Sequence, residues 1–219
     1  MAAGRGTRFG EMTKNIPKPM LEINGKKLLE HNILKLPSEI DEIIIIVGYL
    51  KEKIMDFFGR EYNGKKITYV VQEELLGSGH ALHLCKNILK NKFLVLMGDD
   101  MYSEKDMRDC LKHDFCIGLK KIEENFNGGK IILDKRGNLK EILEGEHEAG
   151  NNFLNIGLYV LNYNFFKYDL VKIKGKNEYG LPQTLVKVAQ DYPVITKETD
   201  FWIQINYQKD LEKARKIMK

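Results

Sequence analysis

The run Ile43-Ile44-Ile45-Ile46-Val47 decides the fold class of this chain. It is apolar at every position, as expected for a strand of a parallel sheet that is covered on both faces, and Ile67–Val71 and Phe93–Met97 repeat the pattern. Apolar residues recur at helical spacing in the segments around these runs, which are Lys26–Leu36, Leu50–Phe58 and Ala81–Leu89. This alternation predicts an α/β fold with a Rossmann-like, mixed and mainly parallel sheet flanked by helices.

The second half of the chain is built differently. Gly129–Leu133 and Leu139–Leu143 flank the polar turn Asp134–Asn138, which predicts a β-hairpin. Phe153–Leu161 is expected to be a further strand, and Asp210–Met218 a closing helix. We expect one domain over residues 1–219, with a join between its two halves near residue 110.

Composition excludes several classes of protein. The chain has 219 residues, a formal net charge of +4 and no concentrated basic block, so a nucleic-acid partner is not expected. No apolar run approaches the ~20 residues of a membrane helix, and no secretory signal pattern opens the sequence. The three cysteines form no CxxC pair, which favours buried thiols in a reducing cytoplasm. The sequence thus predicts a cytoplasmic protein without a membrane partner.

Two loops near the start suit phosphate binding. In Gly4-Arg5-Gly6-Thr7-Arg8 the glycines let backbone amides approach an anion, and Arg8 adds a planar cation. The same five residues are equally consistent with an ordinary surface turn. A phosphate-binding loop of this kind normally follows an apolar strand, so such a strand would be expected before it. In Pro17-Lys18-Pro19 the prolines are expected to hold Lys18 in an extended, stiffened segment, which suits fixing a phosphate. Taken alone, the loop is better explained as a rigid, solvent-exposed loop whose lysine has no function.

Two further loops follow predicted strands. Gln72 comes directly after Ile67–Val71, and its side-chain amide matches the edge of a pyrimidine base, while Gly77 and Gly79 leave room for a base or ribose. Ser78 could instead cap a helix that begins near Ala81. Asp99 follows Phe93–Met97 at the position where α/β sheets bind ligands, and its carboxylate suits Mg²⁺, although Gly-Asp is also a common turn.

Together these loops resemble the sugar-1-phosphate nucleotidyltransferase family. Its AAGxGTR loop, PKP loop, Q-x(4)-G[TS] loop and strand ending in GD occur here in the same order, and the resemblance extends to about residue 211. It implies an Mg²⁺-dependent enzyme that joins a nucleoside triphosphate to a sugar 1-phosphate and releases pyrophosphate. The nucleotide would bind to about residues 1–110 and the sugar to about residues 111–219, and a homo-oligomer is compatible with the family.

The resemblance also implies roles for individual residues. The catalytic residues would be Arg8, Lys18 and Asp99. The nucleotide would contact Ala2, Ala3, Gly4, Gly6, Thr7, Gln72, Gly77 and Ser78. The sugar would contact Gly129, Glu144 and Asn155. The metal ligands would be Asp99 and Asn206.

Two departures from the family pattern narrow the range of expected substrates. Gly145 stands where many members have a lysine that grips the sugar phosphate, and Gln204 stands where many have the second metal-binding aspartate. Asn206 matches the asparagine that N-acetylglucosamine-1-phosphate uridylyltransferases use instead. With Gln72 for the base, these features favour UTP, then dTTP, and an amino sugar or hexose. A choline-phosphate-type cytidylyltransferase and a non-catalytic nucleotide-binding regulatory module are the alternatives.

Overall fold

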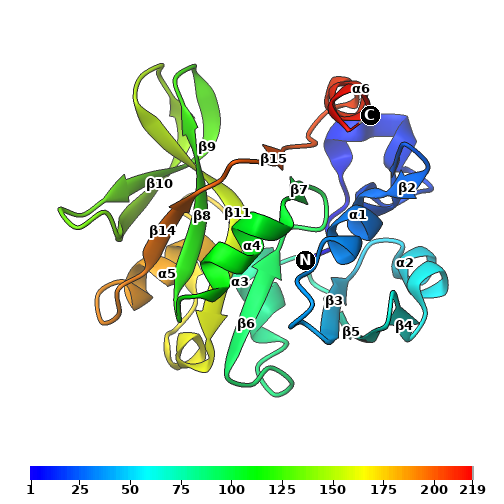
Figure 1. Cartoon of the computed structure of the whole chain (residues 1–219), viewed down its shortest axis with the longest axis horizontal. Coiled ribbons are helices and arrows are strands. Elements are labelled where there is room, and N and C mark those ends of the chain that lie inside the picture. Colours follow the sequence, from blue (N-terminus) through cyan, green and yellow to red (C-terminus); the bar gives the residue numbers. More distant parts are fainter. Residues whose placement is uncertain (219) are drawn as a thin grey trace. The chain divides into compact units, whose positions relative to one another are not determined.

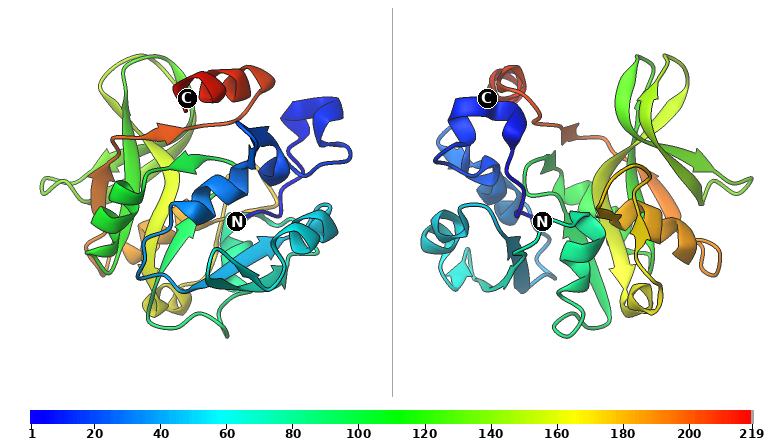
Figure 2. Two further views of the ribbon diagram at one scale, coloured as in Figure 1. Left: turned by 45° about the vertical axis from the view of Figure 1, so that its right-hand side comes forward. Right: turned by 180° about the vertical axis from the view of Figure 1, so that it is seen from behind.

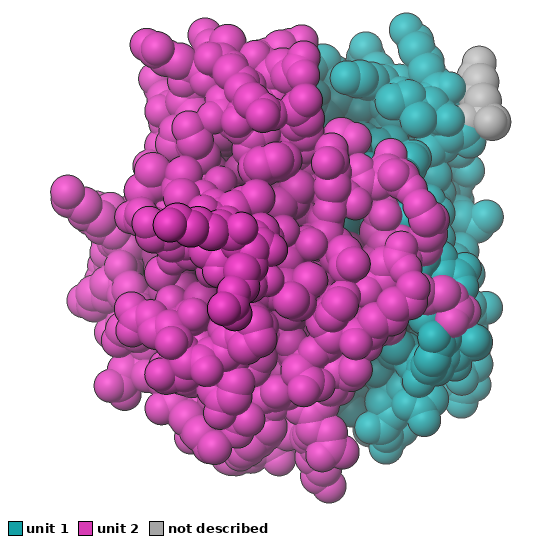
Figure 3. Space-filling view, turned by 60° about the vertical axis from the view of Figure 1, so that its left-hand side comes forward, with its two compact units in different colours: residues 1–75, 97–104, 201–219 teal, residues 76–96, 105–200 magenta. Residues whose placement is uncertain are grey.

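A computed structural model describes residues 1–218. The contacts within the chain gather into two compact units, which Figure 3 distinguishes by colour. Unit 1 contains Met1–Leu75, Met97–Glu104 and Phe201–Lys219, and unit 2 contains Leu76–Leu96 and Lys105–Asp200. Each unit is therefore assembled from segments that are distant in the sequence. A single domain joined near residue 110 stays a prediction.

Unit 1 is built on a three-stranded sheet in the order β3 (Glu42–Val47), β5 (Lys65–Val71) and β4 (Glu61–Tyr62) (Figure 1). Strands β3 and β5 are parallel, in register from Glu42↔Lys66 to Val47↔Val71, and α2 (Lys51–Phe58) lies between them in sequence. A buried cluster that includes Ile45, Ile54 and Phe58, together with α1 (Leu28–Leu34), covers this sheet. The β-branched runs thus form the predicted parallel pair because both of their faces are apolar.

A second apolar cluster of unit 1 joins chain segments that lie about a hundred residues apart in sequence. The short strands β7 (Met101–Tyr102) and β15 (Trp202–Ile203) pair antiparallel, with Trp202 opposite Tyr102. The remaining elements are β1 (Glu22–Ile23), β2 (Lys26–Lys27), α6 (Gln208–Ile217) and the 3₁₀ helices Thr7–Thr13 and Lys18–Met20. Buried Met101, Ile203 and Leu211 hold them together. This pairing brings the Gly98-Asp99-Asp100 turn to the segment Trp202–Asn206.

Unit 2 contains a six-stranded sheet (Figure 2). Its strand order is β10 (Leu139–His147), β9 (Phe126–Leu133), β11 (Asn152–Asn162), β8 (Cys116–Ile122) and β14 (Ile195–Glu198), and β6 (Lys92–Leu96) pairs with β11. Residues 156–161 of β11 are all buried, as expected for a central strand. The predicted hairpin is the antiparallel pair β9–β10.

The helices of unit 2 are α3 (Gly77–His83), α4 (Glu104–Leu111), α5 (Leu181–Val188) and the 3₁₀ helix Tyr163–Lys167, and β12 (Val171–Lys172) pairs with β13 (Tyr179–Gly180). Helix α3 begins at Gly77, four residues before the predicted start at Ala81. The reason is tertiary, because the backbone of β13 packs against Gly77 and Gly79 and leaves no room for side chains there.

The α/β class is confirmed, with sheets and helices in both units. Among residues 1–218 the parallel pairs are β3–β5 and β8–β14, fewer than a mainly parallel sheet would have. The physical reason is connection length. Strands β8 to β11 follow one another through short turns, and short connections join only antiparallel strands. No helix within residues 1–218 is both long and apolar enough to span a membrane.

Candidate active site

The first three residues anchor the glycine loop in unit 1. The Ala2 amide donates to the Ile46 carbonyl at 2.8 Å, and the Tyr49 amide donates to the Ala3 carbonyl at 3.1 Å. On the other side, the Gly98 amide donates to the Met1 carbonyl at 2.8 Å. Residues 1–3 therefore lie beside both the end of β3 and the segment that leads to Asp99. Ala2 and Ala3 are buried, whereas Gly4 beyond them is exposed.

Gly6 brings the loop close to Lys18. It has φ +62°, and the Thr13 hydroxyl donates to its carbonyl at 3.0 Å. A Cβ atom at Gly6 would lie only 2.8 Å from the Cβ of Lys18. Thr7 and Arg8 form the start of the 3₁₀ helix that follows, and both are exposed. In the predicted phosphate-binding loop, Gly4, Thr7 and Arg8 are therefore exposed, whereas Gly6 is packed tightly against Lys18.

Lys18 is buried and forms an ion pair with Asp99. The two side chains are 9% and 37% exposed, and Lys18 Nζ lies 2.6 Å from Asp99 Oδ2. The prediction that Lys18 lies in an extended segment is wrong, because it begins a 3₁₀ turn in which the Met20 amide donates to the Pro17 carbonyl. Proline is well suited to the first turn of a helix, so Pro19 continues this turn instead of preventing it.

Asp100 is a site residue that sequence reasoning missed. Its carboxylate accepts from Trp202 Nε1 at 3.2 Å and from the Ile205 amide at 3.3 Å, and its backbone carbonyl accepts from Asn32 Nδ2 at 2.6 Å. Burial, reinforced by the charge of Asp99, raises the pKa of Asp100 to about 7. The doublet Asp99-Asp100 was the available signal, but only the tertiary pairing of β7 with β15 shows that the second carboxylate points inward.

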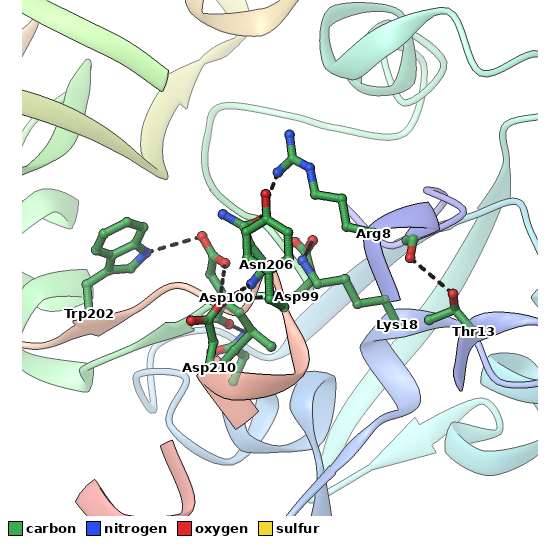
Figure 4. Close-up of polar contacts among 12 residues, drawn as sticks. Arg8, Thr13, Lys18, Asp99, Asp100, Trp202, Asn206 and Asp210 are labelled. Carbon is green, nitrogen blue, oxygen red and sulfur yellow. Dashed lines mark hydrogen bonds and ion pairs between the residues drawn. The ribbon is translucent and has the colours of Figure 1, made fainter. Parts of the chain in front are cut away.

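Asn206 lies with Arg8 in the same group of side chains (Figure 4). Arg8 Nη1 donates to Asn206 Oδ1 at 3.3 Å. The backbone amides of Asn206 and Tyr207 both donate to Asp210 at 2.8 Å, which fixes the start of α6. Gln204 is exposed, whereas Ile203 and Ile205 on either side are buried. Of the two candidates for the second metal ligand, Asn206 is therefore the one placed beside Arg8.

The donors in this group suit a magnesium ion. Within the part of the chain that is described, no three His, Cys, Asp or Glu side chains converge to hold a metal ion. Mg²⁺ does not need such a cluster, because it is bound through one or two carboxylates plus substrate phosphates and retained waters. The Asp99 carboxylate already pairs with one cation, the ammonium of Lys18, and Asn206 provides an amide oxygen. The residues present thus have the right chemistry for the expected ion.

Gln72 stands at the end of β5 in unit 1. The residue is 4% exposed, and its backbone amide donates to the Val47 carbonyl at 2.8 Å. Gly77 and Ser78, which were predicted to receive the same base, belong to unit 2. There Gly77 has φ +91°, and the Ser78 hydroxyl accepts from the Leu181 amide at 3.1 Å. Ser78 therefore does not cap its own helix but satisfies an amide at the start of α5.

The three residues predicted to contact the sugar lie together in unit 2. Gly129 is directly opposite Glu144 in the β9–β10 register. A Cβ atom at Gly129 would lie 3.2 Å from Glu144 Oε1 and 3.5 Å from the Cβ of Asn155. Asn155 Nδ2 donates to the Tyr159 hydroxyl at 2.8 Å, and Asn155 Oδ1 accepts from the Gly157 amide at 3.1 Å. The hairpin register thus gathers residues that are 11 to 26 positions apart in the sequence.

Comparison with known proteins identifies the family. The family model described as nucleotidyl transferase matches residues 1–216. The chain belongs to this family. It is 35% identical to the bifunctional protein GlmU of Methanococcus vannielii over 222 residues, covering 98% of this chain but 53% of that protein. It is 26% identical to the UTP–glucose-1-phosphate uridylyltransferase AglF of Haloferax volcanii, covering 98% and 93% of the two chains.

Solved structures share the fold. A putative glucose-1-phosphate thymidylyltransferase from Bacillus anthracis superposes with a TM-score of 0.84 at 22% identity, over 99% of this chain and 92% of that one. A UDP-glucose pyrophosphorylase gives 0.79 at 21% identity, over 99% and 95%. These likenesses concern the fold alone. The present chain spans about half the length of the GlmU relatives, at 53% for the first two.

Proposed function

We propose that this protein transfers a nucleotide from a nucleoside triphosphate to a sugar 1-phosphate and releases pyrophosphate. The observation that carries the proposal is the Lys18–Asp99 ion pair, at 2.6 Å, beside the glycine loop of a nucleotidyl transferase fold. A buried ammonium and a partly exposed carboxylate at this point can hold phosphate and a divalent cation side by side. We also propose that both units act as one nucleotidyltransferase domain, which is compatible with a homo-oligomer.

The reaction needs alignment and charge neutralisation more than proton transfer. A phosphate oxygen of the sugar 1-phosphate forms a bond to the α-phosphorus, the bond from that phosphorus to the bridging oxygen of the β-phosphate breaks, and its electron pair leaves on pyrophosphate. Arg8 would hold the leaving phosphates, and Lys18 the α-phosphate and the sugar phosphate. Asp99 and Asn206 would hold Mg²⁺, which when bound neutralises charge on the triphosphate. Fixed cations aimed at developing charge are an effective form of catalysis.

The base is read in this proposal by Gln72, with UTP as the first choice and dTTP as the second. Its side-chain amide offers one donor and one acceptor, which is what the edge of uracil or thymine requires. The residue is buried at the end of β5, so its amide has a restricted orientation. AglF, a relative at 26% identity, is described as a UTP-dependent uridylyltransferase.

The sugar would be held by Gly129, Glu144 and Asn155, which lie together on β9, β10 and β11. Gly145, in place of a lysine, and Asn206 favour an amino sugar such as N-acetylglucosamine 1-phosphate, with a hexose 1-phosphate as the other choice. We place the reaction in the cytoplasm, in keeping with three free and buried cysteines, Cys85, Cys110 and Cys116.

Pyrophosphate release tests this function. The purified chain is incubated with Mg²⁺, each of the common triphosphates and a panel of sugar 1-phosphates together with choline phosphate. We expect release that requires both substrates and is greatest with UTP. Release only with CTP and choline phosphate would replace the proposal with a choline-phosphate cytidylyltransferase, and no release with any pair would indicate a non-catalytic nucleotide-binding module. Asp99→Ala should lower the signal roughly 100- to 1,000-fold, whereas Asp56→Ala, at an exposed position of α2, should leave it unchanged.

A further inference from the structure

A side chain outside the predicted site contacts Glu144. Gln183, in the first turn of α5, donates from Nε2 to Glu144 Oε1 at 2.8 Å. Glu144 lies on β10, 39 residues earlier in the chain. Hydrogen bonds to a charged group are stronger than those between neutral groups, so this contact restricts the carboxylate even though the pair is exposed.

The amide of Gln183 is held in one orientation. Its Oε1 atom is buried and has no hydrogen-bond partner among residues 1–218. A Cβ atom at Gly180 would lie 1.5 Å from this oxygen and 2.6 Å from Cδ of Gln183, so the amide occupies the space that a side chain at 180 would need. Turning the amide over would place its oxygen against the carboxylate of Glu144. The charge of Glu144 and the missing side chain of Gly180 thus fix the NH₂ group toward Glu144.

The contact leaves one oxygen of Glu144 available. Oε1 lies between the Gln183 amide and the backbone of Gly129, since a Cβ at Gly129 would approach it to 3.2 Å. Within the described residues Oε2 forms no hydrogen bond. An exposed glutamate would otherwise sample several rotamers, and a fixed partner reduces that freedom before a ligand arrives.

Gln183 is also attached to a rigid support. The Leu181 amide at the start of α5 donates to the Ser78 hydroxyl at 3.1 Å, and the Tyr179 amide donates to the Leu76 carbonyl at 2.7 Å. The first turn of α5 is therefore anchored on the start of α3. Side chains carried by such anchored helices hold their partners more accurately than side chains on free loops.

We propose that Gln183 is a positioning residue that orients the Glu144 carboxylate, so that its Oε2 accepts a hydroxyl of the sugar phosphate. This inference rests on the proposed function. It concerns the sugar side of the reaction, because the hydrogen bond of the Gln183 side chain is to Glu144, a member of the predicted sugar group. Disturbing Gln183 should therefore weaken sugar binding and leave the affinity for the nucleotide unchanged.

Three variants test the role of Gln183 in the full chain with the best substrate pair from the panel. Gln183→Glu places a carboxylate against Glu144, and we expect the KM for the sugar phosphate to rise about tenfold, a factor that corresponds to about 1.4 kcal/mol. Gly180→Ala should produce a similar rise, because its methyl group takes the place of the amide oxygen. Gln190→Glu, the same change at an exposed position two residues beyond the end of α5, should leave both KM values within about twofold.

The reversed pair separates positioning from general damage. In Gln183→Glu combined with Glu144→Gln the donor and acceptor are exchanged, so its KM for the sugar phosphate should fall well below the product of the two single effects. Equal KM values in Gln183→Glu and Gln190→Glu would overturn the proposal, as would a rise in the KM for the triphosphate alone. Binding of the sugar phosphate by calorimetry gives a readout without turnover. If the wild type neither binds it nor turns over, both proposals fall, whereas wild-type turnover with no effect of Gln183→Glu refutes only this one.

Discussion

Gly6→Ala should damage the protein through one contact that can be evaluated from the structure. A Cβ atom at Gly6 would lie 2.8 Å from the Cβ of Lys18, whereas carbon atoms in contact prefer about 3.5–4.0 Å. Overpacking of this kind costs about 1–3 kcal/mol, and the positive φ of +62° adds about 1–2 kcal/mol. We therefore expect the free energy of unfolding to fall by about 2–5 kcal/mol.

The matched control is Gly25→Ala. Gly25 has φ +80° but nothing within 4 Å of its Cβ position, so this variant carries the backbone strain without the clash. Its unfolding free energy should fall by only about 1–2 kcal/mol. Urea denaturation measures both variants, and pyrophosphate release measures turnover. A displacement of Lys18 by about 1 Å should cost Gly6→Ala roughly 100-fold in turnover, with Gly25→Ala near wild type.

Equal stability in the two variants would refute the reasoning, because it would mean that Lys18 is not packed against the glycine loop. If the stability of Gly6→Ala falls as expected but its turnover stays within about threefold of wild type, only the predicted effect on catalysis is refuted. In that case the packing would be real, but the place of Lys18 would not matter for the reaction.

Three further predictions concern single groups. Asp99→Ala should lower turnover by roughly 100- to 1,000-fold while circular dichroism changes little. Its melting temperature should fall, because the variant leaves the buried Lys18 ammonium without its ion-pair partner. Burial raises the pKa of Cys85 to about 11, so at about pH 8 its thiol should react with a disulfide reagent roughly 100-fold more slowly in the folded protein than in urea. Burial lowers the pKa values of His83 and His113, so the unfolded chain takes up protons first as the pH falls through about 6.5. The urea midpoint should therefore decrease between about pH 7.5 and about pH 5.5, and less steeply in His83→Gln/His113→Gln.

Each of these predictions has a contradicting result. Near-normal turnover of Asp99→Ala would remove Asp99 from the reaction. Rapid labelling of Cys85 in the folded protein would show that its thiol is accessible. A urea midpoint with the same pH dependence in the double histidine variant and the wild type would exclude the two histidines as the cause.

Continuous apolar runs made much of the fold predictable. Ile43–Val47 and Ile67–Val71 became the parallel pair β3–β5, and the polar turn Asp134–Asn138 became the β9–β10 hairpin. Local signals sufficed in these places because burial on both faces, or turn chemistry, determines the structure. The hairpin register then placed Gly129 opposite Glu144.

Tertiary contacts decided what the sequence did not show. Strands β7 and β15 have two residues each and so carry no periodicity, yet their pairing turns Asp100 toward Trp202. The start of α3 depends on the backbone of β13, and the amide of Gln183 reaches Glu144 across 39 residues. Contacts of this kind have no signature in residue spacing or composition. The polar partners of the site residues could therefore be identified only from the structure.

The central proposal is that one chain joins the two substrates. It can be tested by incubating the purified protein with Mg²⁺, UTP labelled at the α-phosphate and N-acetylglucosamine 1-phosphate, and following both products. We predict that the label moves into a nucleotide-sugar and that pyrophosphate appears in equal amount, with both products formed roughly 100- to 1,000-fold more slowly by Asp99→Ala. Two results would contradict the proposal, once every triphosphate and sugar phosphate of the panel has been tried. The label could stay in the triphosphate, or pyrophosphate could be released without a nucleotide-sugar.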